Sequence, residues 1–140
     1  MVVEVSSRSS APTELNLFEN RRVQMVASAT GLAYVSASPE ATRVVRDSVP
    51  DGSVQHTVEA TLPLVAAAHN CGYAVWDYPA LAADLCMASI SVWIRGRPVG
   101  GVSLVYFRDL VPADLLNVLL LPEMRMVALL IGGALNDNWF

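Results

Sequence analysis

The chain has 140 residues, of which 54% are hydrophobic and only 16% are charged, and its formal net charge is −4. This length suits one domain with its own core, and so apolar a composition excludes an intrinsically disordered chain. Duplex DNA is bound by clustered cations, whereas the nine basic residues here form no run. We therefore do not expect the chain to bind DNA by itself, and we expect part of the apolar surplus to form a subunit interface.

Cysteine content and hydropathy predict a cytoplasmic protein. Cys71 and Cys86 are too few for a disulfide framework, and no signal-peptide pattern opens the sequence. The apolar stretch from 115 to 135 carries Pro122, Glu123 and Arg125, and charged residues are costly in hydrocarbon. It is predicted to be a buried helix rather than a membrane span.

The first half of the chain predicts one strand and then three helices. β-Branched residues favour the strand, and small or apolar residues at helical spacing favour the helices. Ser38 is the expected N-cap of the second helix, and Pro63 weakens the early turns of the third unless that helix begins there. The expected elements are a strand at Met1–Ser7 and helices over Val23–Ser38, from Pro39 to about Val49, and over Thr57–Asn70 with Cys71 and Gly72 closing it.

The second half predicts an antiparallel hairpin followed by apolar helices. Residues 87–94 alternate with the period of a strand, and 99–107 form a second β-rich run. Arg95–Pro98 is the expected turn, and Gly72–Asp77 the expected third strand. One helix is expected from Pro112 to about Leu121, with a restart at Pro122. The last helix is apolar on all sides, which predicts burial partly by a second subunit. The fold class is α+β.

Three segments together resemble one family, and each alone is a weak signal. They are Ala27–Gly31, Gly72–Val75 and the hairpin of 88–92 with 99–103. Their order and spacing resemble the GAF-like effector-binding domain of IclR-type bacterial transcription regulators, over about 21–135. The run Ser103–Tyr106 is similar to the branch that controls hydroxyphenylpropionate catabolism. The resemblance implies a GAF-like antiparallel sheet flanked by helices.

The resemblance also implies a ligand site. In this family a small carboxylate effector lies over the sheet, and by position its contacts fall on Ala29, Thr30, Trp76 or Asp77, Cys86, Ser103 and Val105. The N–H groups and positive partial charge of a helix start suit a carboxylate. The alternative is that the small residues of 29–31 merely allow close helix packing. No cofactor and no metal are expected.

Strand periodicity predicts which side chains share a face. Cys86 is expected on the same face of its strand as Ala88, Ile90 and Val92, and Ser103 on the same face of the partner strand as Val105. A thiol and a hydroxyl would then line one pocket. Ser89 and Ser91 are expected on the opposite face. The apolar Val105 favours an aromatic effector over a short oxo-acid, and the aromatic residues Trp76, Tyr78 and Tyr106 fit that expectation. The alternative for Cys86 is a buried small hydrophobe, and aromatic residues are more often core than ligand platform.

The family places a winged helix-turn-helix, a linker helix and a first strand ahead of the matching segment, and none is expected in residues 1–140. The chain is therefore interpreted as one N-terminally truncated effector-binding domain. The leading hypothesis is a non-enzymatic sensor of a small organic acid, assembled as a dimer or tetramer, with no membrane contact and DNA contact only through the missing domain. The alternatives are a decayed pocket that serves only oligomerisation and a GAF-type cysteine enzyme. His56, His69 and Cys71 lack the spacing of a zinc site.

Overall fold

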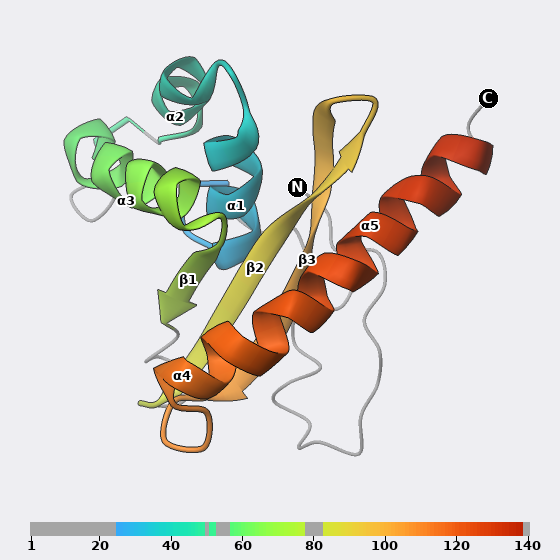
Figure 1. The fold of residues 1–140 in the computed structure, drawn as a ribbon. Helices are drawn as coiled ribbons and strands as arrows, with labels where there is room; N and C mark the ends of the chain where they lie inside the picture. The colour runs from blue at the N-terminus through green and yellow to red at the C-terminus, as the bar shows by residue number, and fades with distance from the viewer. Residues whose placement is uncertain (1–24, 50, 53–56, 78–82, 139–140) are drawn as a thin grey trace.

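The computed structural model of the chain describes residues 25–49, 51–52, 57–77 and 83–138. A three-stranded antiparallel sheet lies between two helical layers (Figure 1). The elements are, in chain order, α1 (Ala29–Ala37), α2 (Ala41–Ser48), α3 (Val58–Cys71), β1 (Ala74–Asp77), β2 (Leu85–Ile94), β3 (Arg97–Phe107), α4 (Ala113–Leu115), the π-helical turn η2 (Leu116–Leu120) and α5 (Leu121–Asn138). The predicted α+β class is confirmed; the strand predicted at Met1–Ser7 lies outside the described residues.

The first described helix begins later than predicted. α1 starts at Ala29 because Ser28 is its N-cap and accepts a hydrogen bond from the Gly31 N–H at 3.1 Å. A turn before it packs so closely that a Cβ on Gly31 would lie 2.0 Å from the Met25 carbonyl oxygen. Glycine is therefore required where this turn crosses the helix start. Val23, the predicted start, lies outside the described residues.

The caps of α2 and α3 follow local side-chain chemistry. Ser38 is not the N-cap of α2, because its hydroxyl accepts from the Glu40 N–H at 3.3 Å and the helix begins only at Ala41. Thr57, the first residue of the predicted helix, is the N-cap of α3, and its hydroxyl accepts from the Ala60 N–H at 3.1 Å. It ends at Gly72, whose φ of +77° places it in the left-handed region. Pro63 lies inside this helix, so α3 does not begin there.

The sheet has the order β1-β2-β3, and the hairpin between β2 and β3 is tighter than predicted. Arg95 and Gly96 form a two-residue turn with φ values of +50° and +73°, and Ile94 pairs with Arg97. Trp93 pairs with Pro98 but Val92 pairs with Gly100, so that Val99 is an extra residue in β3. This β-bulge shifts the register by one residue, and a shift of one reverses which side chains share a face.

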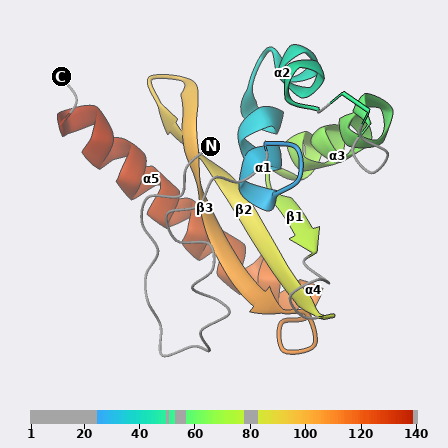
Figure 2. The same ribbon diagram turned by 180° about the vertical axis from the view of Figure 1, so that it is seen from behind.

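Two apolar clusters hold the layers together, one on each face of the sheet. α1, α2 and α3 cover one face, here called the α1 face, with Leu32, Val35 and Val65 in its core. α5 runs across the other face, the α5 face, and buries Leu121, Met124 and Ala128 against even-numbered residues of β2. Figure 2 shows the same sandwich from behind, with α5 separated from α1 by the sheet.

The C-terminal helical segment is continuous, and the predicted break at Pro122 is absent. η2 makes a wide turn in which the Leu121 N–H bonds the Leu116 carbonyl, so the chain enters α5 without interruption. Within one chain this helix is only partly covered, since Leu129 is 71% exposed and Leu130 is 68% exposed, and its burial partly by a second subunit stays a prediction. By length and composition alone, Ala113–Asn138 meets the requirements for a membrane span.

Candidate ligand-binding face

Two rows of side chains cross the sheet on the α1 face. In an antiparallel sheet, residues directly opposite each other project to the same side. One row is apolar and runs through Trp76, Met87 and Val105. The neighbouring row carries hydroxyls, at Ser89 and Ser103. A surface with an apolar band beside a polar band suits a ligand that has both kinds of group.

The first turn of α1 adds a third hydroxyl to the polar row. Thr30 Oγ1 lies 2.7 Å from Ser103 Oγ, which lies 2.9 Å from Ser89 Oγ. Ser89 is fully buried and its hydroxyl also contacts the Val102 carbonyl at 3.1 Å, whereas Ser103 is exposed. α1 is held against β3 here, since a Cβ on Gly101 would lie 2.8 Å from Thr30 Cγ2. The result is a hydrogen-bonded chain of three hydroxyls with an accessible middle member.

The backbone of α1 contributes donors at the same place. The first N–H groups of a helix have no carbonyl partner within it, and they carry part of its positive end charge. Ala29 and Thr30 occupy these positions, while the Ser28 side chain accepts from Gly31. Ala29 is fully buried, so a small anion over the hydroxyl chain would meet the half-buried Thr30 at the helix start together with Ser103 of β3.

Cys86 and Asp77 lie on the opposite side of the sheet, on the α5 face. Cys86 pairs with Asp77 on β1 and with Tyr106 on β3, and Tyr106 packs against the α5 cluster. The expected pocket with Cys86 and Ser103 on one wall is wrong, because the bulge at Val99 places them on different faces. Ser89, expected to face away from Ser103, is bonded to it. Of the seven implied site residues, the structure brings together Ala29, Thr30, Trp76, Ser103 and Val105.

The Cys86 thiol is buried and electrostatically paired. The Cys86 thiol donates to Asp77 Oδ1 at 3.3 Å, and the Arg108 guanidinium donates to the same oxygen at 2.5 Å. Burial, followed by the neighbouring Asp77 carboxylate, raises the pKa of the Cys86 thiol. The hydrogen bond from Arg108 lowers the pKa of Asp77. The thiol is thus kept protonated, which is the wrong state for a nucleophile.

Two residues of this face were missed from the sequence: Met87, whose Sδ lies 3.9 Å from Thr30 Oγ1, and Ser89. The signal that finds them is the strand sequence Pro98 to Gly101. Proline and glycine within a strand mark bulges, and a bulge here reverses the faces.

The described residues contain no group of three His, Cys, Asp or Glu side chains that could hold a metal ion. His69 is exposed, and its Nδ1 lies 2.9 Å from the Ser36 carbonyl oxygen. His56 and Tyr78 lie outside the described residues.

No family model and no curated protein sequence matches the chain, but solved structures do. The repressor BlcR of Agobacterium tumefaciens superposes with a TM-score of 0.68 at 16% identity, over 84% of this chain and 50% of that one. The C-terminal domain of the Escherichia coli transcriptional regulator KdgR gives a TM-score of 0.67 at 17% identity, over 84% and 74%. The fold is that of IclR-type C-terminal domains. An IclR homologue from Microbacterium hydrocarbonoxydans, complexed with 4-hydroxybenzoate, gives 0.59 at 21% identity over 86% and 49%.

This IclR-type fold agrees with the resemblance found in the sequence, and the matched structures bear names of regulators rather than enzymes. The chain spans about half the length of BlcR, since the match covers 50% of that protein.

Proposed function

We propose that the chain is the non-enzymatic effector-sensing domain of an IclR-type transcription regulator. A small organic acid binds on the α1 face, and its binding changes how a DNA-binding domain outside these 140 residues fits its operator. The protein acts in the cytoplasm. The observation that carries the proposal is the exposed Thr30–Ser103 hydroxyl pair, with oxygens 2.7 Å apart, at the first turn of α1.

The chemistry of this face favours an acid over a neutral ligand. Its carboxylate accepts from the helix-start N–H at Thr30 and from the Ser103 hydroxyl, whose single hydrogen turns from Ser89 Oγ to the ligand, and hydrogen bonds to a charged group are the stronger kind. The negative end of the ligand then lies over the hydroxyl chain, and its body lies along the row of Met87 and Val105.

The apolar row selects an aromatic acid, and a hydroxyphenylpropionate is our first choice, with short oxo-acids second. Trp76, Met87 and Val105 offer no charged group to a second carboxylate or to a polar body. The 4-hydroxybenzoate complex of the Microbacterium homologue supports this class of ligand on this fold. Asp77 and Cys86, on the other face, are left out of the proposed site.

Thermal unfolding of the full chain with a panel of aromatic acids and their amides tests the proposal. An acid present at a hundred times its dissociation constant stabilises the folded state by about 2.7 kcal/mol, and its amide at the same concentration by much less. Ser103→Leu fills the site and abolishes the stabilisation, while the protein without ligand remains folded because Ser103 is exposed.

Val99→Leu is the matched control, since Val99 lies in the same strand but is exposed at the bulge. It keeps the stabilisation by the acid. If Ser103→Leu binds as well as the wild type, the site is wrong. If no acid or oxo-acid stabilises the wild type, the sensor proposal fails, and the α1 face belongs to a domain that serves only oligomerisation.

The proposal includes assembly through α5 as a dimer or tetramer. Met126 and Leu130, one turn apart on α5, are largely exposed, and apolar side chains grouped on one helix commonly mark an interface. Light scattering coupled to size exclusion should give two or four times the mass of 15.0 kDa. A single monomeric species at micromolar concentration contradicts this part of the proposal.

A further inference from the structure

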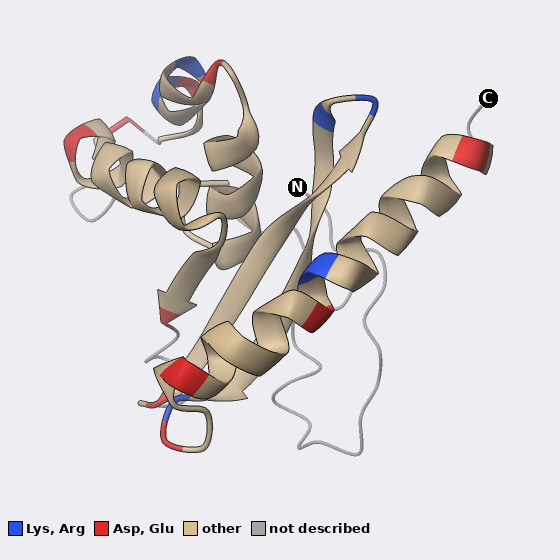
Figure 3. Ribbon diagram, viewed as in Figure 1, with Lys and Arg blue, Asp and Glu red and all other residues tan. Residues whose placement is uncertain are grey.

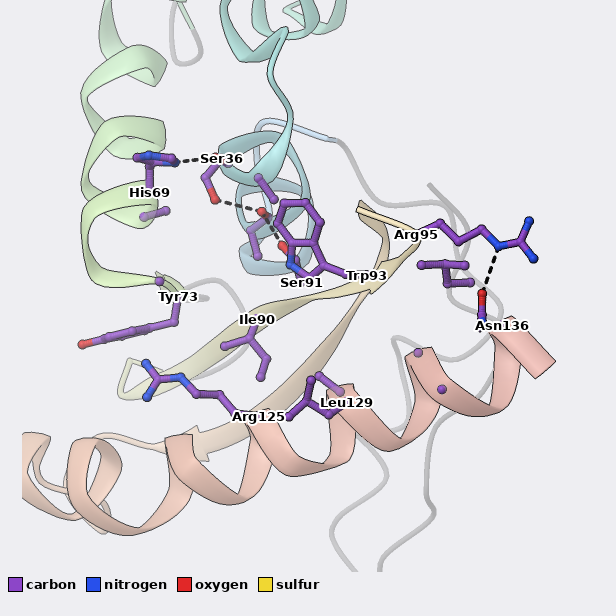
Figure 4. Close-up of a pocket in the computed structure, with 18 residues that line it drawn as sticks. Ser36, His69, Tyr73, Ile90, Ser91, Trp93, Arg95, Arg125, Leu129 and Asn136 are labelled. Carbon is purple, nitrogen blue, oxygen red and sulfur yellow. Dashed lines mark hydrogen bonds between the residues drawn. The ribbon is translucent and has the colours of Figure 1, made fainter. Parts of the chain in front are cut away.

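A concave site that is separate from the hydroxyl chain lies at the outer edge of β2. β1 pairs with β2 only as far as Ser89, so among the described residues the edge of β2 from Ile90 to Ile94 has no strand neighbour. The end of α1 and α3 border this edge on one side and α5 on the other, leaving an open groove of about 810 Å³. We call it the edge groove, and Figure 4 shows its lining.

The floor of the edge groove is apolar, and two of its large side chains are accessible. Trp93 projects from β2 and Leu129 from α5, and Ile90, which is buried in the α5 cluster, lies between them at the bottom of the groove (Figure 4). Trp93 is 46% exposed and Leu129 is 71% exposed. Covering such surface removes apolar area from water, which is favourable in proportion to that area. The groove volume lies in the range of about 300–1,000 Å³ that small-molecule sites have.

The charge of the lining has a single sign. Arg95, Arg125 and His69 line the groove and no Asp or Glu does, although the whole chain carries a net charge of −4. Arg95 is engaged by Asn136, whose Oδ1 accepts from its Nε at 3.1 Å. Arg125 is the only basic residue within α5, and Figure 3 shows the basic and acidic positions along the ribbon.

Arg125 is the group that an anion would meet. It belongs to the second turn of α5 and points toward Tyr73 (Figure 4), and its Nη2 would lie 3.8 Å from a Cβ on Gly72. Among the described residues it makes no hydrogen bond and no ion pair. A guanidinium has five donors and binds carboxylates through two parallel hydrogen bonds.

We propose that the edge groove is a second ligand site, which binds an amphipathic organic acid through its carboxylate at Arg125 and its hydrophobic body along Ile90, Trp93 and Leu129. It shares no residue with the site proposed on the α1 face. Either of the two proposed sites can therefore be correct without the other.

The experiment follows the indole N–H signal of Trp93 in ¹H–¹⁵N spectra of the full chain, assigned from Trp93→Phe. The probes are 3-phenylpropionate, octanoate and the uncharged 3-phenylpropionamide. In the Ser103→Leu background, where the α1 face is blocked, both acids should move this signal in a saturable way. The amide should bind at least about tenfold more weakly, since it lacks the charge-assisted bonds.

Two variants remove the site by different means. Arg125→Gln deletes the charge and should weaken binding of the acids by about tenfold or more. Gly133→Leu fills the groove, because Gly133 lines it and a Cβ there meets no atom within 4 Å. Arg46→Gln is the matched control, as Arg46 is an exposed arginine on α2 outside the groove. It should bind the acids unchanged.

Three results would overturn the proposal: no movement of the Trp93 signal with either acid, equal binding of acid and amide, or unchanged binding in Arg125→Gln. If the acids stabilise the wild type, lose this effect in Ser103→Leu and never move the Trp93 signal, the edge groove is excluded while the sensor proposal stands. If the acids move the Trp93 signal in Ser103→Leu, and if this substitution leaves the thermal stabilisation by the acids unchanged, the edge groove is supported and the proposed site on the α1 face is wrong.

Discussion

The two faces of the sheet differ in whether their polar side chains are accessible to a ligand. On the α1 face, Ser103 is the middle member of a chain of three hydroxyls and is exposed, so that its oxygen can bond a ligand. On the α5 face, Cys86 is only 1% exposed and is saturated by Asp77 and Arg108. The chemical reactivity of a side chain is therefore a weaker guide to a ligand site than its accessibility and its capacity for a further hydrogen bond. The following predictions test this contrast.

The largest expected effect concerns the contact that closes the α5 face. A Cβ on Gly132 would lie 2.5 Å from the Trp93 carbonyl oxygen, a backbone atom that cannot move aside alone. Gly132→Ala should therefore destabilise the protein by about 1–3 kcal/mol, the usual effect of overpacking. Chemical denaturation measures this as a lower midpoint at an unchanged slope.

Gly133→Ala is its neighbour control, because a Cβ at Gly133 meets nothing within 4 Å. It should stabilise the protein by about 0.5–1 kcal/mol through helix propensity. Equal effects of the two substitutions would mean that α5 does not approach β2 at this point.

Thiol reactivity tests the burial of the Cys86 thiol. Cys71 is exposed and Cys86 is buried, and burial raises the pKa of the Cys86 thiol. At pH 8, Cys86 should therefore react with iodoacetamide at least about tenfold more slowly than Cys71, since the thiolate is the reactive form. Mass spectrometry of the two peptides over time gives both rates. Faster labelling of Cys86 would revive the cysteine-enzyme alternative.

The smallest effect is the pH dependence due to Asp77. The Arg108 hydrogen bond lowers the pKa of Asp77 in the folded protein, so the pair stabilises the fold above the ordinary carboxyl pKa of about 3.9. This stabilisation is lost as the pH falls through the lowered value. Both side chains are more than half exposed, at 55% and 56%, so solvent screens the pair and this stabilisation is small.

Asp77→Asn should accordingly lower the melting temperature slightly at pH 7 and by less at pH 2.5, where the wild-type carboxyl is closer to protonation. Asp47→Asn, an exposed carboxylate on α2, serves as the control. A decrease of equal size at both pH values would assign the loss to packing instead of charge.

Local chemistry made much of the fold predictable. Thr57 and Gly72 bound α3 where a cap and a left-handed glycine are expected, and the alternating residues of β2 and β3 predict the hairpin. The start of α1 was misplaced because residues before it also have helical spacing. Only Ser28, through its bond to the Gly31 N–H, ends that pattern.

The composition of the site was harder to predict because it depends on a single inserted residue. Alternation along β2 groups Cys86 with Ala88 correctly, but it cannot say which residues of β3 share that face. Val99 decides this by adding one residue between Pro98 and Gly100. The exposure of α5 could not be predicted from the sequence either, because an all-apolar helix has the same residue pattern whether its own chain or another molecule covers it.

The wide turn η2 determines which side chains of the following helix α5 point toward the sheet. Leu116 and Leu121 are both buried, yet five residues along an α-helix differ in direction by roughly 140°, so no α-helix could point both at the sheet. The i+5 bond from Leu121 to Leu116 brings them onto one side, and Met124, Ala128 and Gly132 then continue that line. Loss of one residue within η2 would leave this line in place, because an ordinary turn then joins the two leucines. Loss of one residue just after Met124 would instead rotate the rest of α5 by about 100° and carry Leu129 away from the edge groove.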